Sequence, residues 1–390
     1  MTTLAANAKS SLWDVGRYLR QLGVAKLLLL AAVFGLLLFT SAETRGIIFA
    51  ALSDAYLQVS VFVAATLGAI YYLEHRFDVD VSAVLRKYQR WQVPVAALLG
   101  ALPGCGAAVA VVTQYVRGAI SFGSLVAVLT ATMGDAAFLL LAAEPTTGLM
   151  VFAIGMLVGT ITGYTIDAIH GQDFLRADHA EVPDHMPRKT LPRLNRLRPL
   201  WAVLLLPGLV LGTLDLMTIN TNALFGPFAA HDPTQIIGVT GALLAFAMWT
   251  LDPELRFDPG VSRAGGPFVR TVDATNFVTV WVIVGFLIYE LGVHFTGVDL
   301  AALFDTWAPL IPALAVLVGF LPGCGPQIVV TTLYITGAMP LSGQLGNAIS
   351  NDGDALFPAL AIAPRAAFIA TIYSGVPALL VGYGTYLLWG

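Results

Sequence analysis

The chain has 390 residues, of which 57% are hydrophobic and 11% are charged, and its formal net charge is −4. Soluble domains carry about 25% charged residues, so a chain of this composition cannot cover itself with a water-facing surface. The composition therefore excludes a soluble protein and predicts an all-α polytopic membrane protein.

The N-terminal segment 1–24 places several apolar residues on one helical face, which predicts an amphipathic helix at the membrane surface. Nine apolar runs follow, and each approaches the roughly 20 residues that cross a hydrocarbon core. These predicted spans are 25–42, 54–74, 120–143, 147–169, 199–218, 233–251, 275–295, 340–363 and 366–389. The run at 340–363 is less apolar, and we assign it as a span because it matches 120–143 in an internal repeat.

The repeat is centred on the only two cysteines, Cys105 and Cys324, each of which lies in the sequence Pro-Gly-Cys-Gly. Residues 98–118 and 317–337 align without gaps at an offset of 219, and Gly-Asp-Ala at 134–136 recurs at the same offset. Proline and glycine break helices and permit sharp turns, so each segment is predicted to be an interrupted helix. The predicted hinge residues are Pro103, Gly104, Gly106, Pro322, Gly323 and Gly325.

Both interrupted segments are predicted to be re-entrant hairpins, at about 92–118 and about 308–337. With two hairpins and a cytoplasmic N-terminus, all of the 20 Lys and Arg residues except Arg45 lie on the cytoplasmic side. This distribution is the one that the positive-inside rule requires. The second hairpin has weaker support, because a spanning segment there would move only Arg365 to the outside.

This threading divides the chain into two repeats of span–span–hairpin–span–span. Repeat 1 (25–169) starts on the inside, the cytoplasmic loop 170–198 and a linking span (199–218) follow, and repeat 2 (233–389) starts on the outside. The repeats are therefore predicted to be inverted, with the C-terminus on the periplasmic or extracellular side. Inverted repeats with broken helices that meet near the midplane are a recurring plan of secondary transporters.

The two cysteines and a set of aspartates are the candidate ligands for a substrate. Cys105 and Cys324 fall near the N-termini of half-helices, which favour thiolate, a soft ligand that suits ions such as zinc. Asp135 and Asp354 each lie 30 residues beyond a cysteine within a span, where a carboxylate is costly and thus a functional candidate. Further oxygen ligands of the kind that suit manganese come from Asp352, Asn351 and Asn347.

Other polar residues could serve a pathway or a collecting site. Four side chains beyond the hairpin tips are candidates for a pathway wall: Gln114, Gln327, Thr113 and Thr332. The loop 170–198 holds His170, His179 and His185, which could collect a metal ion on the cytoplasmic face. A solvated loop is the simpler interpretation of that composition.

The duplicated Pro-Gly-Cys-Gly, the stretch Asn-Asp-Gly-Asp-Ala-Leu-Phe-Pro at 351–358 and about ten apolar segments resemble a family of ten-segment heavy-metal exporters. Members of that family are also described as manganese transporters or arsenic efflux proteins. The likeness spans nearly the whole chain and implies efflux of a toxic or surplus metal across a bacterial inner membrane. The first repeat departs from the second at Thr132 and Met133, so the site need not be symmetric.

The residues themselves leave the substrate open. The carboxylates favour a divalent cation, manganese first, exported in exchange for protons through Asp354 or Asp352. The thiols favour a softer species, so one alternative is an arsenite or organoarsenical permease. A second alternative is a membrane thiol-disulfide oxidoreductase in which Cys105 and Cys324 form a disulfide. In the favoured interpretation the chain is not an enzyme, needs no cofactor, contacts lipid but no nucleic acid, and could form a homodimer.

Overall fold

The computed structural model of the protein describes residues 24–77, 84–85, 87–175, 192–217, 219–252, 266–299, 301–304 and 308–389. Every regular element within these residues is a helix. The predicted amphipathic segment 1–24 lies outside them apart from its last residue.

The first half of the described chain consists of α2 (Val24–Phe39), α3 (Ala42–Asp54), the π-helix η1 (Ala55–Ser60), α4 (Val61–Phe77), α6 (Gln89–Gly100), α7 (Gly106–Val116), α8 (Phe122–Ala131), α9 (Ala136–Ala143) and α10 (Pro145–His170). Two elements connect it to the second half, α11 (Pro192–Leu216) and the 3-10 helix η2 (Thr221–His231). The second half consists of α12 (Pro233–Leu251), α13 (Pro267–Thr296), η3 (Ala302–Phe304), η4 (Ala308–Leu310), α14 (Ile311–Gly319), α15 (Gly325–Ile335), α16 (Leu341–Ser350), η5 (Gly353–Ala355), α17 (Leu356–Ile362) and α18 (Pro364–Trp389).

Several helices of the second half repeat helices of the first. Adding 219 to the bounds of α7, α8 and α10 gives the bounds of α15, α16 and α18. The helix formed by α3, η1 and α4 runs from 42 to 77 without a break, and its last residue is equivalent to the last residue of α13. This helix begins earlier than the predicted span 54–74, because the hydroxyl of Ser41 accepts a hydrogen bond from the Thr44 N–H and caps it there.

Both Pro-Gly-Cys-Gly segments are helix–turn–helix units, as the interrupted-helix prediction requires. We call α6 with α7 hairpin 1 and α14 with α15 hairpin 2. At each turn the glycine before the cysteine has a positive φ, +89° at Gly104 and +115° at Gly323. Side-chain-bearing residues rarely adopt this conformation, so the turns depend on glycine. Whether the hairpins are re-entrant stays a prediction.

Six helices in the described part of the chain are long and apolar enough to cross a membrane, or seven if the bent pair α8–α9 forms one span. The sequence predicted nine spans. If α8–α9 counts as one span, the difference arises at two places, because α2 has only 16 residues and the predicted span 340–363 divides into α16 and α17 at a polar break. The protein is thus a polytopic helical membrane protein, and its number of crossings stays a prediction.

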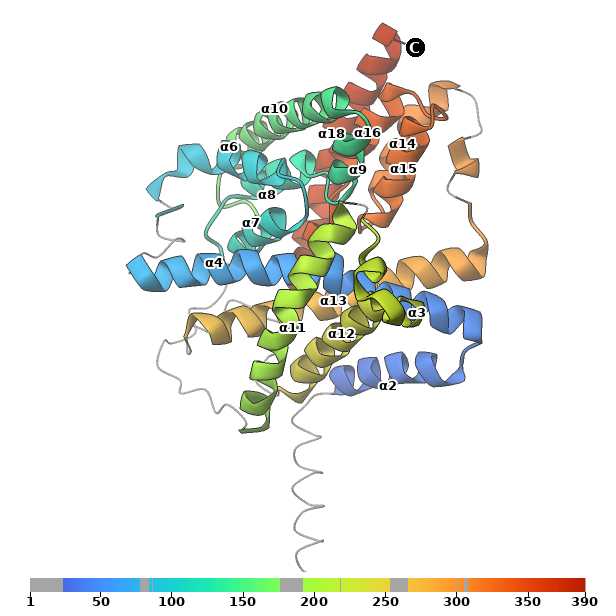
Figure 1. Ribbon diagram of the computed structural model, residues 1–390. Helices are drawn as coiled ribbons and strands as arrows, with labels where there is room; N and C mark the ends of the chain where they lie inside the picture. The colour runs from blue at the N-terminus through green and yellow to red at the C-terminus, as the bar shows by residue number, and fades with distance from the viewer. Residues whose placement is uncertain are drawn as a thin grey trace, which may run out of the picture.

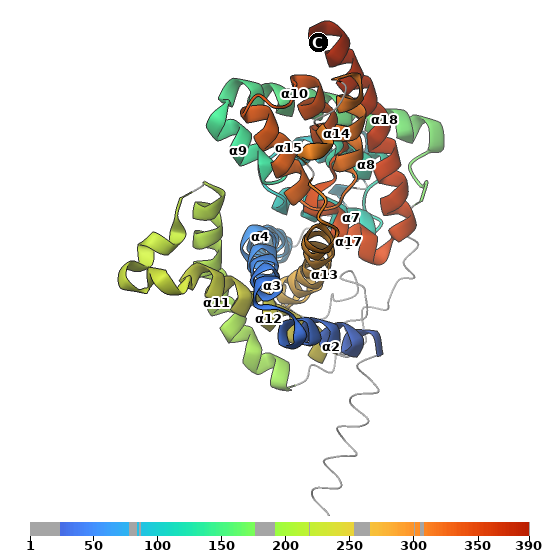
Figure 2. The same ribbon diagram turned by 90° about the vertical axis from the view of Figure 1, so that its right-hand side faces the viewer.

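The helices form two layers (Figures 1 and 2). The first, which we call the scaffold layer, contains α2, α3, α4, α11, α12 and α13, and the second, the hairpin layer, contains α6–α10 and α14–α18 (Figure 2). The long helices of the scaffold layer, α3–α4 and α13, lie side by side (Figure 1). This arrangement leaves the hairpins together on one side of the long helices.

The two long scaffold helices run antiparallel. Thr44 contacts His294 at one end (3.4 Å), and at the other end Glu74 pairs with Arg270 (2.9 Å). Between these ends the Thr279 hydroxyl donates to the Ser60 hydroxyl at 2.7 Å. Ser60 and Thr279 are equivalent positions of the repeat, so they mark the place where the two halves face each other. Antiparallel equivalents are what an inverted repeat requires, although the orientation of each half in a bilayer stays a prediction.

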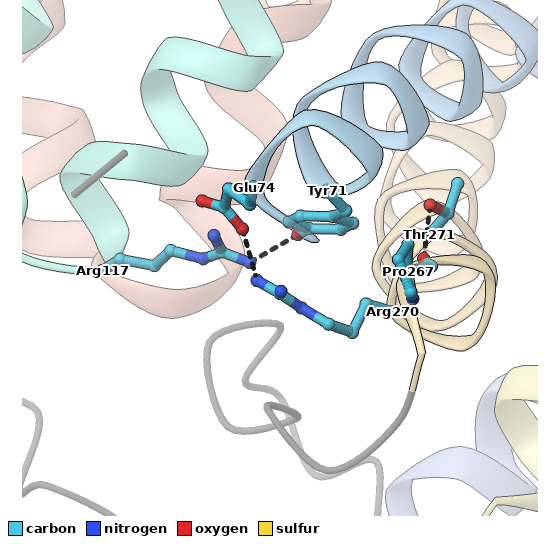
Figure 3. A network of polar contacts seen from close by, with 6 residues as sticks. All are labelled: Tyr71, Glu74, Arg117, Pro267, Arg270 and Thr271. Carbon is cyan, nitrogen blue, oxygen red and sulfur yellow. Dashed lines mark hydrogen bonds and ion pairs between the residues drawn. The ribbon is translucent and has the colours of Figure 1, made fainter. Parts of the chain in front are cut away.

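A polar network ties hairpin 1 to the scaffold layer (Figure 3). Arg117, just after α7, donates to the Tyr71 hydroxyl at 2.5 Å, and Arg270 donates to Glu74. The guanidinium groups of Arg117 and Arg270 lie 5.0 Å and 4.2 Å from the centre of the Tyr71 ring. Stacking of cations on an aromatic ring adds to the hydrogen bonds, so Tyr71 links α4, α7 and α13.

The Glu74–Arg270 pair provides a test of this packing. We expect Glu74→Gln and Arg270→Gln each to lower the free energy of unfolding by about 2 kcal/mol, because each leaves a largely buried charge without its partner. The double variant should lose less than the sum of the two. Thermal unfolding of the detergent-purified protein measures this, and strictly additive losses would show that the pair is not coupled.

Candidate metal centre

The tips of the two hairpins bring the two cysteines into contact. The sulfur atoms of Cys105 and Cys324 lie 3.2 Å apart, and each cysteine is only 1% exposed. The two residues are equivalent positions of the repeat, like Ser60 and Thr279 in the scaffold layer. The cysteines therefore lie where the two halves of the protein face each other.

Asp135 and Asp354 join the cysteines from the breaks in the two helices that follow the hairpins. Asp135 lies in the break between α8 and α9, and Asp354 in the equivalent break between α16 and α17. Oδ2 of Asp354 accepts hydrogen bonds from Sγ of Cys324 (3.0 Å) and Sγ of Cys105 (3.5 Å). One potential ligand atom from each of the four residues lies within 4.8 Å of every other. We call these four residues the thiol–carboxylate cluster.

Glycines in the breaks make room for this approach. The Gly104 N–H donates to the carbonyl of Gly134 at 3.1 Å, which joins the tip of hairpin 1 to the break before Asp135. Gly134 has a φ of +50°, and a Cβ there would lie 2.6 Å from Sγ of Cys324. Its equivalent, Gly353, has a φ of +55°, but a Cβ there would meet no atom closer than 3.8 Å. A side chain at Gly134 would therefore strain the turn and also clash with the sulfur of Cys324.

The carboxylates of the cluster have few internal partners. Both oxygens of Asp135 and Oδ1 of Asp354 are buried and accept no hydrogen bond from the described residues. No basic residue in the described ranges forms an ion pair with either aspartate. Buried carboxylates that lack partners are costly, and a cation held between them would offset that cost. Cysteine sulfur and carboxylate oxygen are both ligand types that zinc takes in proteins, where it is most often four-coordinate.

The remaining predicted substrate residues each have a hydrogen bond outside the cluster. Asp352 is buried, but it accepts hydrogen bonds from the hydroxyls of Thr371 and Ser374 on α18. Asn351 shapes its own break by accepting from the Gly353 N–H at 2.5 Å. Asn347 donates to a backbone carbonyl of α14 at 2.9 Å. The sequence did not predict that Thr371 and Ser374 bond to Asp352, because the residues lie about 20 positions apart and no sequence pattern indicates the contact.

The predicted pathway residues also separate into different environments. The hydroxyls of Thr113 and Thr332 each donate to a carbonyl of their own helix. Gln114 lines a cavity of about 130 Å³ whose walls are mostly apolar, between α4, α6 and α7. Gln327 is fully buried in α15, and neither polar atom of its amide has a hydrogen-bond partner among the described residues. Gln327 thus combines unsatisfied polar atoms with a position only three residues after Cys324.

The histidine-containing loop can be described only at its start. His170 is the last residue of α10, where it contacts the Tyr373 hydroxyl at 2.6 Å and stacks on Phe174. His179 and His185 lie outside the described residues. The predicted collecting site therefore stays a prediction.

The two break glycines provide a matched test of the cluster. We expect Gly353→Ala to cost about 1–2 kcal/mol from its left-handed backbone alone. Gly134→Ala should cost more, and it should also lower the affinity for metal, because its methyl group would displace Cys324. Thermal unfolding and calorimetric titration with Zn²⁺ would measure both effects. Equal affinities in the two variants would argue against a role of Cys324 in binding.

Comparison with known proteins identifies the family of the chain. The chain matches, over residues 43–389, a protein family described as "Putative, 10TM heavy-metal exporter". No curated protein and no solved structure matches the chain. The matched range includes both hairpins, both breaks and all four residues of the thiol–carboxylate cluster. The chain therefore belongs to this family of ten-segment heavy-metal exporters.

Proposed function

We propose that the protein exports a divalent heavy-metal ion across the inner membrane of a bacterium by secondary transport. The ion would bind between Cys105, Cys324, Asp135 and Asp354. The observation that carries the proposal is the approach of these four ligand atoms to within 4.8 Å of one another in a buried position. The site would also lie at the interface of the repeats, where transporters built from repeats bind their substrates.

The donor set favours zinc or an ion of similar softness. Carboxylates alone suit manganese, the ion that the sequence predicted first, whereas thiolates prefer softer ions. The two sulfurs are in contact, so an ion bound between the four cluster residues would have to accept sulfur ligands. Zinc does so readily and also accepts carboxylate oxygens. Manganese stays a prediction that the same binding experiments test.

A difference between the two hairpins supports alternating access. Ten of the eleven residues of α7 are buried, whereas only four of the eleven in α15 are buried. Gly106 and Thr113 lie on one face of α7, and a Cβ at Gly106 would lie 2.8 Å from Thr66 of α4. The equivalent of Thr113 on α15, Thr332, is exposed, although Gly325, the equivalent of Gly106, does approach the scaffold layer, since a Cβ there would lie 3.0 Å from Tyr289 of α13. We propose that hairpin 1 is closed against the scaffold layer in this state and that transport requires the two hairpins to exchange these positions.

The cluster residues can be tested against a neighbouring aspartate. We expect Cys324→Ser and Asp135→Asn each to lower the affinity for Zn²⁺ by about 100-fold, because each removes one ligand of four. Asp352→Asn serves as the control and should keep an affinity close to that of the wild type, since Asp352 bonds to α18. Calorimetric titration measures binding, and mass spectrometry of total metals in expressing cells measures export. Full binding and export in both cluster variants would contradict the proposal.

Proton exchange is the predicted driving force. Thiols must lose their protons to bind a metal, so loading of the cluster releases protons. We expect zinc flux into proteoliposomes to fall towards the level of protein-free vesicles when an ionophore collapses an imposed pH gradient. Flux that is independent of the gradient would rule out proton coupling while leaving metal binding untouched.

The pair of thiols also favours one second candidate, an arsenite permease. Trivalent arsenic binds thiols, and the 3.2 Å separation of the two sulfurs would let one arsenic atom contact both. Such a substrate would depend on both cysteines but not on Asp135, so arsenite export by Asp135→Asn would favour it over a divalent metal. The oxidoreductase alternative rests on the same contact, but both sulfurs are buried away from any partner thiol.

A further inference from the structure

A buried row of polar side chains lies on α15 and α16, next to the thiol–carboxylate cluster, and one of them, Asn347, also reaches α14, where it donates to the Ala315 carbonyl. Gln327 and Thr331 are four residues apart on one face of α15, and Gln344 and Asn347 are three apart on one face of α16. The Gln344 side-chain amide donates to the Thr331 hydroxyl at 3.1 Å, so the two faces meet. None of the four side chains is exposed. We call these four residues the polar row.

The polar row begins at the cluster. Helices α15 and α16 follow each other through a short turn at 336–340 and therefore run in opposite directions. The contact between Thr331 and Gln344 fixes their register, which places Gln327 level with Asn347. One further turn along, the same register places Cys324 level with Asn351. The row thus extends from the cysteine of hairpin 2 towards the turn at 336–340.

Several polar atoms of the row have no partner among the described residues. They are Oε1 and Nε2 of Gln327, Oε1 of Gln344 and Oδ1 of Asn347. A buried amide group left unpaired costs about 1–3 kcal/mol, so a row of them indicates that something else fills the hydrogen bonds. Both donors and acceptors are unpaired, and water satisfies both, whereas a bare cation would satisfy only the acceptors.

The first repeat has no counterpart of this row. The positions equivalent to Gln327, Thr331, Gln344 and Asn347 are Ala108, Val112, Leu125 and Val128. These four residues are buried and apolar, although their helices α7 and α8 pack in the same way as α15 and α16. Packing of these two helices therefore does not require polar residues at these positions. The polar row occurs in repeat 2 and not in repeat 1.

We propose that the polar row is a hydrated route along which a divalent cation passes between the cluster and the membrane face at the 336–340 turn. This inference rests on the proposed function and adds where the ion travels. Amide and hydroxyl oxygens along the row would replace part of the hydration shell of the ion. In the predicted topology the 336–340 turn lies outside the cell, so the row serves release of the exported ion.

The other repeat provides the substitutions for a test. A triple variant, Gln327→Ala, Gln344→Leu and Asn347→Val, places the residues of repeat 1 in repeat 2. We expect its zinc flux into proteoliposomes to fall about tenfold or more, because the ion loses the hydrogen-bonding groups along its route. Its calorimetric affinity for Zn²⁺ should stay close to that of the wild type, since no cluster residue changes. Leu125→Met, a volume-conserving change at the position equivalent to Gln344, is the matched control and should behave as the wild type.

The outcomes separate this inference from the proposed function. Unchanged flux in the triple variant would overturn the route. Loss of zinc binding in that variant would also overturn it, because the row would then be part of the primary site. If the wild type binds no metal, the proposed function fails, and the hydration of the row remains measurable by itself.

Hydration can be measured without any transport. In a background with Cys105→Ser and Cys324→Ser, we expect Gln344→Cys to react with N-ethylmaleimide at least about tenfold faster than Leu125→Cys, because maleimides react with thiols that water can reach. The two positions are equivalent in the repeat, and both are buried. Mass spectrometry measures the labelling. Equal rates at the two positions would show that the row is no wetter than its apolar counterpart.

Discussion

Four acidic groups, two thiols and two carboxylates, lie buried within 4.8 Å of one another, and no base in the described ranges is paired with them. This crowding of four groups that each lose a proton to bind a metal is the constraint on which the rest of the site depends. Helix breaks, glycine turns and paired hairpin tips all serve to bring these groups to one point. An arrangement that is costly when empty and favourable with a cation is what a carrier needs, because the ion itself then stabilises the loaded state.

The duplicated fold explains how two distant segments of one chain make a single site. Equivalent residues contact each other in both layers, Cys105 with Cys324 and Ser60 with Thr279. Because equivalent residues of the two repeats surround the site, two perfectly identical repeats would give it the same access from both faces of the membrane. The two halves nevertheless differ, since α7 is more completely buried than α15 and only the second repeat carries the polar row. The structure therefore combines a symmetric ligand set with asymmetric surroundings.

Much of this organisation could be predicted from the sequence. The Pro-Gly-Cys-Gly pair identified both hairpins and both cysteines, because proline and glycine act locally on the backbone. The choice between Asp352 and Asp354 could not be made in this way. The two residues lie in the same break, and their roles differ because Thr371 and Ser374 of α18 bind one of them. The early start of α3 depends on the cap at Ser41, which hydropathy does not detect. Gln114 and Gln327 likewise look alike in sequence, and only packing separates them.

X-ray absorption spectroscopy of the zinc-loaded, detergent-purified protein is the most direct test of the thiol–carboxylate cluster. The proposed site predicts two sulfur ligands at about 2.3 Å and two oxygen ligands at about 2.0–2.2 Å around the metal. The sulfur shell should disappear in the double variant Cys105→Ser and Cys324→Ser. A wild-type spectrum with nitrogen and oxygen ligands only would contradict the account, because the metal would then bind away from the hairpin tips.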